Sequence, residues 1–177
     1  MSSKSVSFVK IRRLTAAGVF AALIYVFTAY LHIPTGAGYT HTGDGLIYLA
    51  ACLLPAPYAI AAGAIGGALS DGLSGFLVWL PATVIIKAVT ALFFSSKGEK
   101  ILTLRNVLGI IPSGIICIVG YSLYEGTVMA GELSWTAITA AFTQTPAYCI
   151  QIGASTVLFV VVALLLDKVG FKKMFNK

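Results

Sequence analysis

The stretch GAIGGALSDGLSGFLVWLPATVIIK, residues 63–87, decides the fold. It predicts an apolar helix rich in small residues that reaches Asp71, a turn through Gly72 to Gly75, and a second apolar helix that carries Lys87. An ionisable side chain in lipid costs free energy, so its presence indicates a functional or structural role. Asp71 and Lys87 are expected either to line a functional cavity or to form a structural ion pair.

The composition around this stretch is that of a membrane protein. Of the 177 residues, 58% are hydrophobic and 10% are charged, and the mean hydropathy is +0.93. An apolar helix of about 20 residues crosses a bilayer. We therefore predict an all-α membrane protein: a single domain, residues 1–177, folded as a compact bundle of six transmembrane helices. The expected spans are about 14–31, 45–54, 58–69, 80–94, 107–124 and 147–166.

The basic residues indicate the orientation of the chain. Of its 12 Lys and Arg residues, all but Lys87 fall in the N-terminal segment, the 95–106 loop or the C-terminal tail. These segments lie on one side of a six-span arrangement, so the positive-inside rule predicts cytoplasmic N- and C-termini and a multi-pass protein of the cell membrane. The net charge of +6 then reflects orientation and contact with the lipid bilayer, and no nucleic-acid partner is expected.

Two loops are expected on the opposite, outer side. Residues 32–44 contain Pro34 and three glycines and predict a loop that can move. Residues 131–144 are too polar and too short to cross the membrane, and they predict an outer loop with an interfacial helix.

The sequence gives little support for catalysis. Gly72-Leu73-Ser74-Gly75 matches the short G-x-S-G pattern of rhomboid-type intramembrane serine proteases, but both histidines precede this serine instead of following it on a later helix. There is no phosphate-binding loop for ATP hydrolysis. The three cysteines are widely spaced and suggest no metal site. We expect no enzyme activity, no cofactor and no metal.

A set of polar and aromatic side chains gathers instead in the outer half of the predicted bundle. Aromatic rings with polar tips suit a small heteroaromatic ligand, although Tyr and Trp are also enriched at membrane interfaces for other reasons. The candidate ligand-binding residues are Tyr39, His41, Asp44, Trp79, Lys87, Tyr121, Tyr124, Glu125, Tyr148 and Gln151.

Lys87 lies about 10 Å below the outer end of its helix at about 1.5 Å per residue, so it needs a partner. We predict Asp71 as that partner, in a structural ion pair, with Glu125 as the second choice. The alternative is that Lys87 faces the ligand.

The first predicted helix carries Ala17 and Ala21 at four-residue spacing, with Gly18 and Ala22 beside them. Such a strip of small residues lets another helix approach closely, either within the bundle or from another protein.

Taken together, several motifs resemble the substrate-binding S component of an energy-coupling factor (ECF) vitamin transporter, closest to the riboflavin-type and uncharacterised branch. They are the Ala17/Ala21 strip, Gly43-Asp44-Gly45, GAIGGALSDGLSG at residues 63–75, and the run from Trp79 to Lys87.

The resemblance implies a membrane subunit that captures a vitamin or its precursor from outside under the first loop. It also implies docking of Ala17 and Ala21 on a transmembrane T component, which two ATPase subunits drive. A stand-alone secondary carrier is the main alternative, although it would need inverted repeats that are not evident here.

Overall fold

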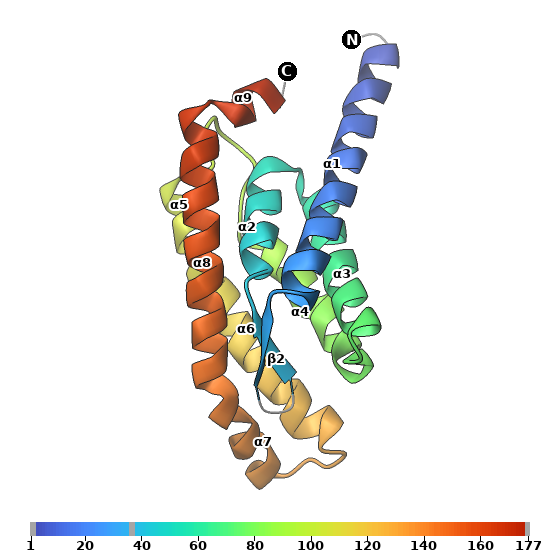
Figure 1. Ribbon diagram of the computed structural model, residues 1–177, viewed down its shortest axis with the longest axis vertical. Helices are drawn as coiled ribbons and strands as arrows, with labels where there is room; N and C mark the ends of the chain where they lie inside the picture. Colours follow the sequence, from blue (N-terminus) through green and yellow to red (C-terminus); the bar gives the residue numbers. More distant parts are fainter. Residues whose placement is uncertain (1–2, 36–37, 176–177) are drawn as a thin grey trace.

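The computed structural model describes residues 3–35 and 38–175 as a bundle of helices with one β-hairpin (Figure 1). The elements are α1 (Ser3–Ala29), β1 (His32–Thr35), β2 (Gly38–His41), α2 (Asp44–Leu53), α3 (Ala56–Leu73), η1 (Leu77–Trp79), α4 (Leu80–Leu92), α5 (Leu104–Leu108), α6 (Ile110–Tyr124), η2 (Glu125–Met129), α7 (Trp135–Ala141), η3 (Phe142–Gln144), α8 (Thr145–Lys168) and α9 (Phe171–Phe175).

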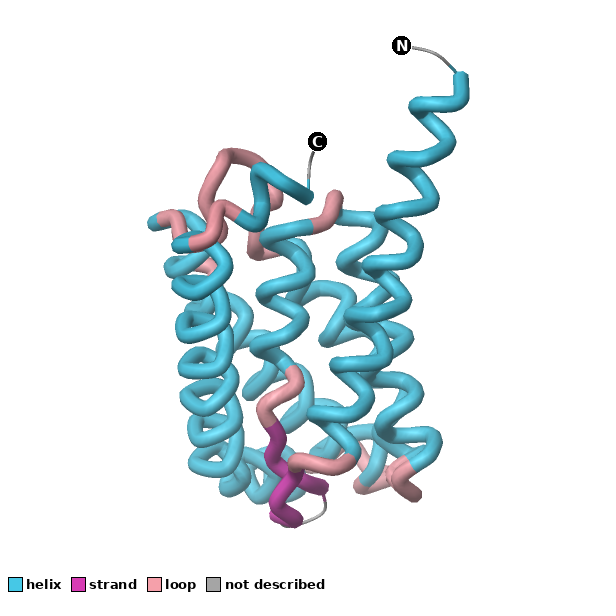
Figure 2. Tube along the Cα trace, turned by 45° about the horizontal axis from the view of Figure 1, so that its top comes forward, coloured by secondary structure: helices cyan, strands magenta, loops and turns pink. Residues whose placement is uncertain are grey.

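The short helix α2 lies in the middle of the bundle. Around it, α1 packs on α3, α3 on α4, α4 on α6, and α6 on α8. The β-hairpin contacts both α1 and α8 and lies at the end of the bundle opposite the two termini (Figures 1 and 2). We call these the hairpin end and the terminal end.

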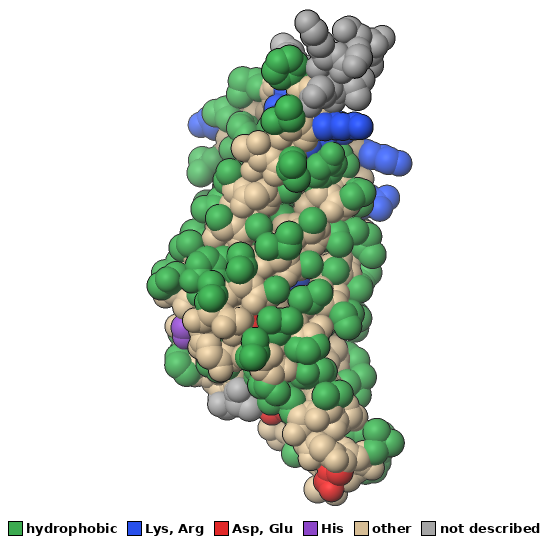
Figure 3. All heavy atoms as spheres, turned by 90° about the vertical axis from the view of Figure 1, so that its right-hand side faces the viewer, with side chains coloured by type: hydrophobic (Ala, Val, Ile, Leu, Met, Phe, Trp, Pro, Cys, Tyr) green, Lys and Arg blue, Asp and Glu red, His purple; other side chains and the backbone are tan. Residues whose placement is uncertain are grey.

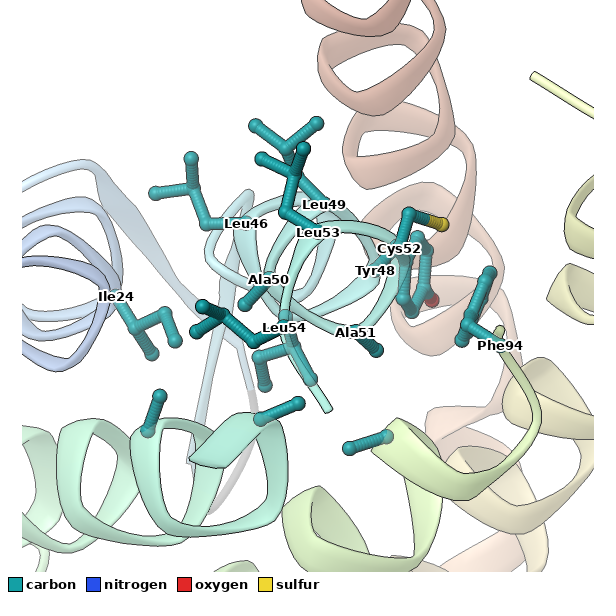
Figure 4. Close-up of a cluster of buried hydrophobic side chains, with 14 of the residues drawn as sticks. Ile24, Leu46, Tyr48, Leu49, Ala50, Ala51, Cys52, Leu53, Leu54 and Phe94 are labelled. Carbon is teal, nitrogen blue, oxygen red and sulfur yellow. The ribbon is translucent and has the colours of Figure 1, made fainter. Parts of the chain in front are cut away.

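Helix α2 is central because it has no polar face. All ten of its residues are buried, which is typical of a helix that is enclosed on every side. Figure 4 shows its side chains pointing outward to the surrounding helices. Tyr48 stacks on Phe94 with ring centroids 4.6 Å apart, and it meets the edge of Phe159 at 5.9 Å. This packing fixes the position of Asp44, the first residue of α2.

Two glycines of the stretch that decides the fold permit the close approach of α3 to its neighbours. A Cβ atom on Gly66 would lie 2.7 Å from the Cβ of Ile24 in α1, and one on Gly67 would lie 2.7 Å from the Cγ2 of Thr83 in α4. Small residues at such contacts let helix backbones pack tightly in a membrane. The helical hairpin α3–α4 is therefore built around these glycines.

The prediction that Ala17 and Ala21 form a surface docking strip is wrong for this structure. Each is only 6% exposed, and a Cβ atom on Gly66 would lie 2.8 Å from the carbonyl oxygen of Ala21. These alanines mediate the packing of α1 on α3 within the bundle, while Gly18 and Ala22 on the neighbouring face are exposed.

The predicted outer loops contain more regular structure than expected. Residues 32–35 and 38–41 pair as antiparallel strands, with His32 opposite His41, in a fold whose other regular elements are helices. Residues 131–144 contain the predicted helix as α7, whose first turn is capped where the Ser134 hydroxyl accepts a hydrogen bond from the backbone N–H of Ala137 at 3.0 Å.

The 95–106 segment is also more ordered than a simple loop. The carboxylate of Asp167 accepts hydrogen bonds from the backbone N–H groups of Ile101 and Leu102 at 2.7 and 2.9 Å. The ammonium of Lys172 donates to the carbonyl of Lys100 at 3.1 Å. These hydrogen bonds hold the 95–106 segment against the C-terminal part of the chain at the terminal end.

Within the described residues, three helical segments are long and apolar enough to cross a membrane: Phe8–Ala29, Leu104–Met129 and Trp135–Lys168. Asp44–Leu53 and Leu77–Leu92 are shorter apolar helices. In Figure 3, Lys and Arg side chains lie toward the terminal end, Asp and Glu toward the hairpin end, and hydrophobic side chains cover much of the face between them. This distribution is that of a helical membrane protein.

Candidate functional site

A cavity opens at the hairpin end, between the hairpin and helices α1, α3, α4, α6 and α8. Its empty volume is about 530 Å³, including open solvent at the mouth. Fifteen of the described residues line it: Thr28, Thr35, Gly38, Tyr39, His41, Asp71, Trp79, Thr83, Lys87, Tyr121, Glu125, Gln144, Ala147, Tyr148 and Gln151.

The floor of the site is a buried ion pair between Lys87 and Asp44. The Lys87 Nζ lies 2.6 Å from Asp44 Oδ1, and both side chains are at most 4% exposed. Gln151 donates from Nε2 to Asp44 Oδ2 at 2.8 Å. A buried carboxylate is tolerated when its charge is paired and its oxygens are hydrogen-bonded, and both conditions hold here.

The predicted ion pair between Lys87 and Asp71 is therefore wrong. Asp44, at the start of the central helix α2, is held beside Lys87 of α4, 43 residues away in the chain. A Cβ atom on Gly67 would lie only 3.2 Å from the Cγ of Lys87, so Gly67 leaves room for the lysine stem. The sequence predicted that Lys87 lies deep in the bundle, but its partner is Asp44 of α2 and not Asp71 of α3.

Asp71 instead ties the hairpin to the end of α3. The Tyr39 hydroxyl donates to Asp71 Oδ1 at 2.6 Å, and the Tyr39 ring packs against Phe76 with centroids 4.6 Å apart. Burial, followed by the neighbouring negative charge of Asp71, raises the pKa of Tyr39 above its ordinary value. The tyrosine therefore stays protonated and acts as a donor that holds the hairpin closed over the cavity.

Aromatic rings form one wall of the cavity. The ring of Tyr121 stacks on that of Tyr148 with centroids 5.8 Å apart, and Trp79 meets Tyr121 edge-on at 5.8 Å. The Tyr121 hydroxyl donates to Thr83 at 3.0 Å. The Lys87 Nζ lies 5.3 Å from the centroid of the Tyr121 ring, which is within the range of a cation–π contact.

His41 is buried at the base of the hairpin as a neutral imidazole. Its Nδ1 accepts a hydrogen bond from the backbone N–H of Gly43 at 3.1 Å. Burial lowers the pKa of His41 to about 3, and this effect outweighs the opposing charge of Asp44. The imidazole helps to join β2 to α2 and is not a free base.

The arrangement suits binding more than chemistry. Aromatic faces, hydroxyl groups and carboxylates converge on one recess, which is how proteins hold small ring compounds. Ser74 of the G-x-S-G match is not among the residues that line the recess.

A comparison with known protein families matches residues 8–168 to the ECF-type riboflavin transporter S component. The chain belongs to this family. It is thus a membrane protein and the substrate-binding subunit of an ECF transporter, whose family implies a small-molecule substrate, a T component and ATPases as partners. A search of curated proteins found no match.

Eight of the ten predicted ligand-binding residues of the S component line the cavity: Tyr39, His41, Trp79, Lys87, Tyr121, Glu125, Tyr148 and Gln151. Asp44 lies beneath the cavity as the partner of Lys87. Tyr124 is turned toward the start of α4, where its hydroxyl donates to the carbonyl of Val78 at 2.8 Å.

The sequence did not single out Thr28, Thr35 or Thr83 as lining residues. Threonine is common in apolar helices and turns and carries no signal of its own. Only the crossing of α1, the hairpin and α4 brings these three hydroxyl groups to one recess.

We expect acid to destabilise the S component through His41. Because its pKa is lower in the folded state than in the unfolded state, the unfolded state binds the proton more readily, and stability falls as the pH drops below about 6.5. Between pH 7.5 and pH 5 the loss attributable to His41 should be about 2 kcal/mol.

The matched variant is His41→Asn, whose side-chain oxygen can still accept from the Gly43 N–H. Unfolding midpoints of both proteins at pH 7.5 and pH 5 check the expectation. The acid-induced drop should be smaller in His41→Asn, and equal drops would contradict the assignment.

Proposed function

We propose that this S component captures a vitamin or vitamin precursor with a small heteroaromatic ring in the hairpin-end cavity. In this proposal the chain spans the cell membrane six times with both termini in the cytoplasm, so that the hairpin faces outward. Release of the ligand to the cell is driven by two ATPase subunits acting through the T component. The chain itself performs no chemistry on the ligand.

One observation carries the proposal: the recess combines stacked aromatic rings with polar groups and is covered by the hairpin. The Tyr39 hydroxyl bonds to Asp71, and the Thr40 hydroxyl donates to the carbonyl of Ala147 at 3.3 Å. In this proposal, these bonds open when the hairpin moves to admit the ligand.

The six-span topology is supported by the packing of the six main helices into one bundle and by the charge distribution. Eleven of the 12 basic residues lie in the three segments assigned to the cytoplasm, which follows the positive-inside rule. The surrounding helices enclose the short helix α2, and tilt or local thinning of the bilayer accommodates the short helix α4.

Uptake into proteoliposomes tests this function against the stand-alone carrier. Labelled riboflavin, thiamine and pyridoxine are offered to vesicles that contain the S component alone, or the S component with a T component, two ATPase subunits and internal ATP. We expect uptake only in the complete assembly. Equal uptake by the S component alone would support the carrier and overturn the proposal.

The control is the complete assembly without ATP. It should bind the labelled compound at the membrane without accumulating it, because capture needs no energy whereas release against a gradient does. Accumulation without ATP would contradict the proposal that the S component only captures the ligand and that the ATPase subunits drive its release.

A further inference from the structure

Resting on the proposed function, we infer that the ligand is a heteroaromatic compound with a positive charge or amino groups, which bind Asp71 and Glu125. Neither a phosphorylated nor a carboxylated compound fits. The inference concerns the charge of the ligand and is independent of which transport partners release it.

The first observation is the charge of the cavity. Its only charged lining residues within the described part of the chain are Asp71, Glu125 and Lys87, since His41 is neutral. The positive charge of Lys87 is already satisfied by Asp44 at 2.6 Å. The two remaining carboxyl groups therefore determine the sign of the charge that a ligand meets in the recess, and this charge disfavours an anion.

The second observation is that these carboxyl groups have acceptor capacity to spare. Asp71 is 3% exposed, and its Oδ1 accepts from Tyr39. The Thr83 hydroxyl also interacts with this carboxyl group, yet Oδ2 has no hydrogen-bond partner among residues 3–35 and 38–175. In the same part of the chain, Oε2 of Glu125 is buried without a partner.

A buried acceptor without a donor is costly, and a ligand that supplies the donor regains that cost on binding. Ammonium and amino groups are donors and form the stronger, charge-assisted hydrogen bonds with carboxylates. A phosphate or carboxylate would present only acceptors to Asp71 and Glu125 near neutral pH.

The aromatic wall favours the same class of ligand. Trp79, Tyr121 and Tyr148 line the recess together with the two carboxyl groups, and electron-rich ring faces attract cations. A flat, positively charged ring would gain from both parts of the site, with its ring on the aromatic wall and its donors on Asp71 and Glu125.

The test uses three compounds that share one pyridine ring and differ at one substituent. Pyridoxamine carries an aminomethyl group there, pyridoxine a hydroxymethyl group and 4-pyridoxate a carboxylate. Equilibrium binding to the full-length S component in nanodiscs is measured at pH 7.5, with riboflavin as an uncharged fourth compound. We expect pyridoxamine to bind at least tenfold more tightly than pyridoxine, and 4-pyridoxate to bind most weakly.

The charge-neutral variants Asp71→Asn and Glu125→Gln locate the effect. Asp71→Asn retains an oxygen for the Tyr39 hydroxyl, so the hairpin keeps its bond. Each variant should reduce the preference for pyridoxamine over pyridoxine at least threefold. Glu132→Gln, at an exposed position outside the cavity, is the matched control and should leave the preference unchanged.

Failure of this inference differs from failure of the proposed function. Binding of riboflavin, pyridoxine or 4-pyridoxate without any preference for the amine would overturn the inference and leave capture intact. A preference that survives in both variants would overturn the assignment to Asp71 and Glu125. If none of the four compounds binds, the inference is overturned and the capture function loses support as well.

Discussion

Lys87→Met should destabilise the protein by about 3–5 kcal/mol, the usual effect of breaking a buried ion pair by removing one partner. Among residues 3–35 and 38–175, the variant leaves the buried Asp44 carboxylate with Gln151, at 2.8 Å, as its remaining side-chain hydrogen-bond partner. Asp44 also begins α2, around which the other helices pack, so the unpaired charge affects the whole bundle. Unfolding in mixed micelles, followed by circular dichroism, measures the loss.

The double variant Lys87→Met with Asp44→Asn should recover much of the lost stability, because it removes both charges and keeps an oxygen for Gln151. Asp71→Asn combined with Lys87→Met should give no such recovery, since Asp71 bonds to Tyr39. Lys97→Met, at an exposed position, is the control for loss of a lysine and should change stability little. A stable Lys87→Met protein that fails to bind ligand would show that Lys87 serves the ligand instead.

Ala21→Trp should prevent the protein from folding, whereas Ala22→Trp should be tolerated. Ala21 is 6% exposed and its backbone lies against Gly66 of α3, so an indole ring there must separate α1 from α3. Overpacking by a few methylene groups already costs about 1–3 kcal/mol, and an indole adds far more volume. Ala22 is exposed on the adjacent face.

Size-exclusion chromatography and a melting curve of each variant check this expectation. The same proteins are then tested for co-purification with a T component. An Ala21→Trp protein that folds with an unchanged melting temperature and fails to co-purify would restore the role in docking that the sequence had suggested.

The helices could be predicted from the sequence because their signals are local. Pro55 separates α2 from α3, and Pro57 lies in the first turn of α3. Apolar runs bounded by polar turns mark the other main helices, whose observed bounds lie close to the expected ones apart from the longer first helix. The pairing of strands 32–35 and 38–41 was missed because Pro34 and three glycines within residues 32–44 are typical of a loop.

The site was partly predictable for a related reason. Aromatic and ionisable residues in apolar surroundings stand out in a sequence, and most of those singled out do line the cavity. Their pairing was not predictable, because Asp44 and Asp71 were both near the outer side and only tertiary packing decides which reaches Lys87. The orientation of Ala17 and Ala21 was likewise open, since a strip of small residues serves both internal packing and docking.

Native mass spectrometry of the purified S component most directly tests the claim that this chain captures an unaltered small molecule in the hairpin-end cavity. The protein is expressed in cells grown on rich medium and released from the detergent micelle in the spectrometer. We predict one small heteroaromatic compound bound per chain, chemically unchanged after prolonged incubation, and lost when Tyr121 and Tyr148 are both replaced by Ala in a protein that still folds. A bound compound that the Tyr121/Tyr148 variant fully retains, or one that the purified chain converts to a product, would contradict the account.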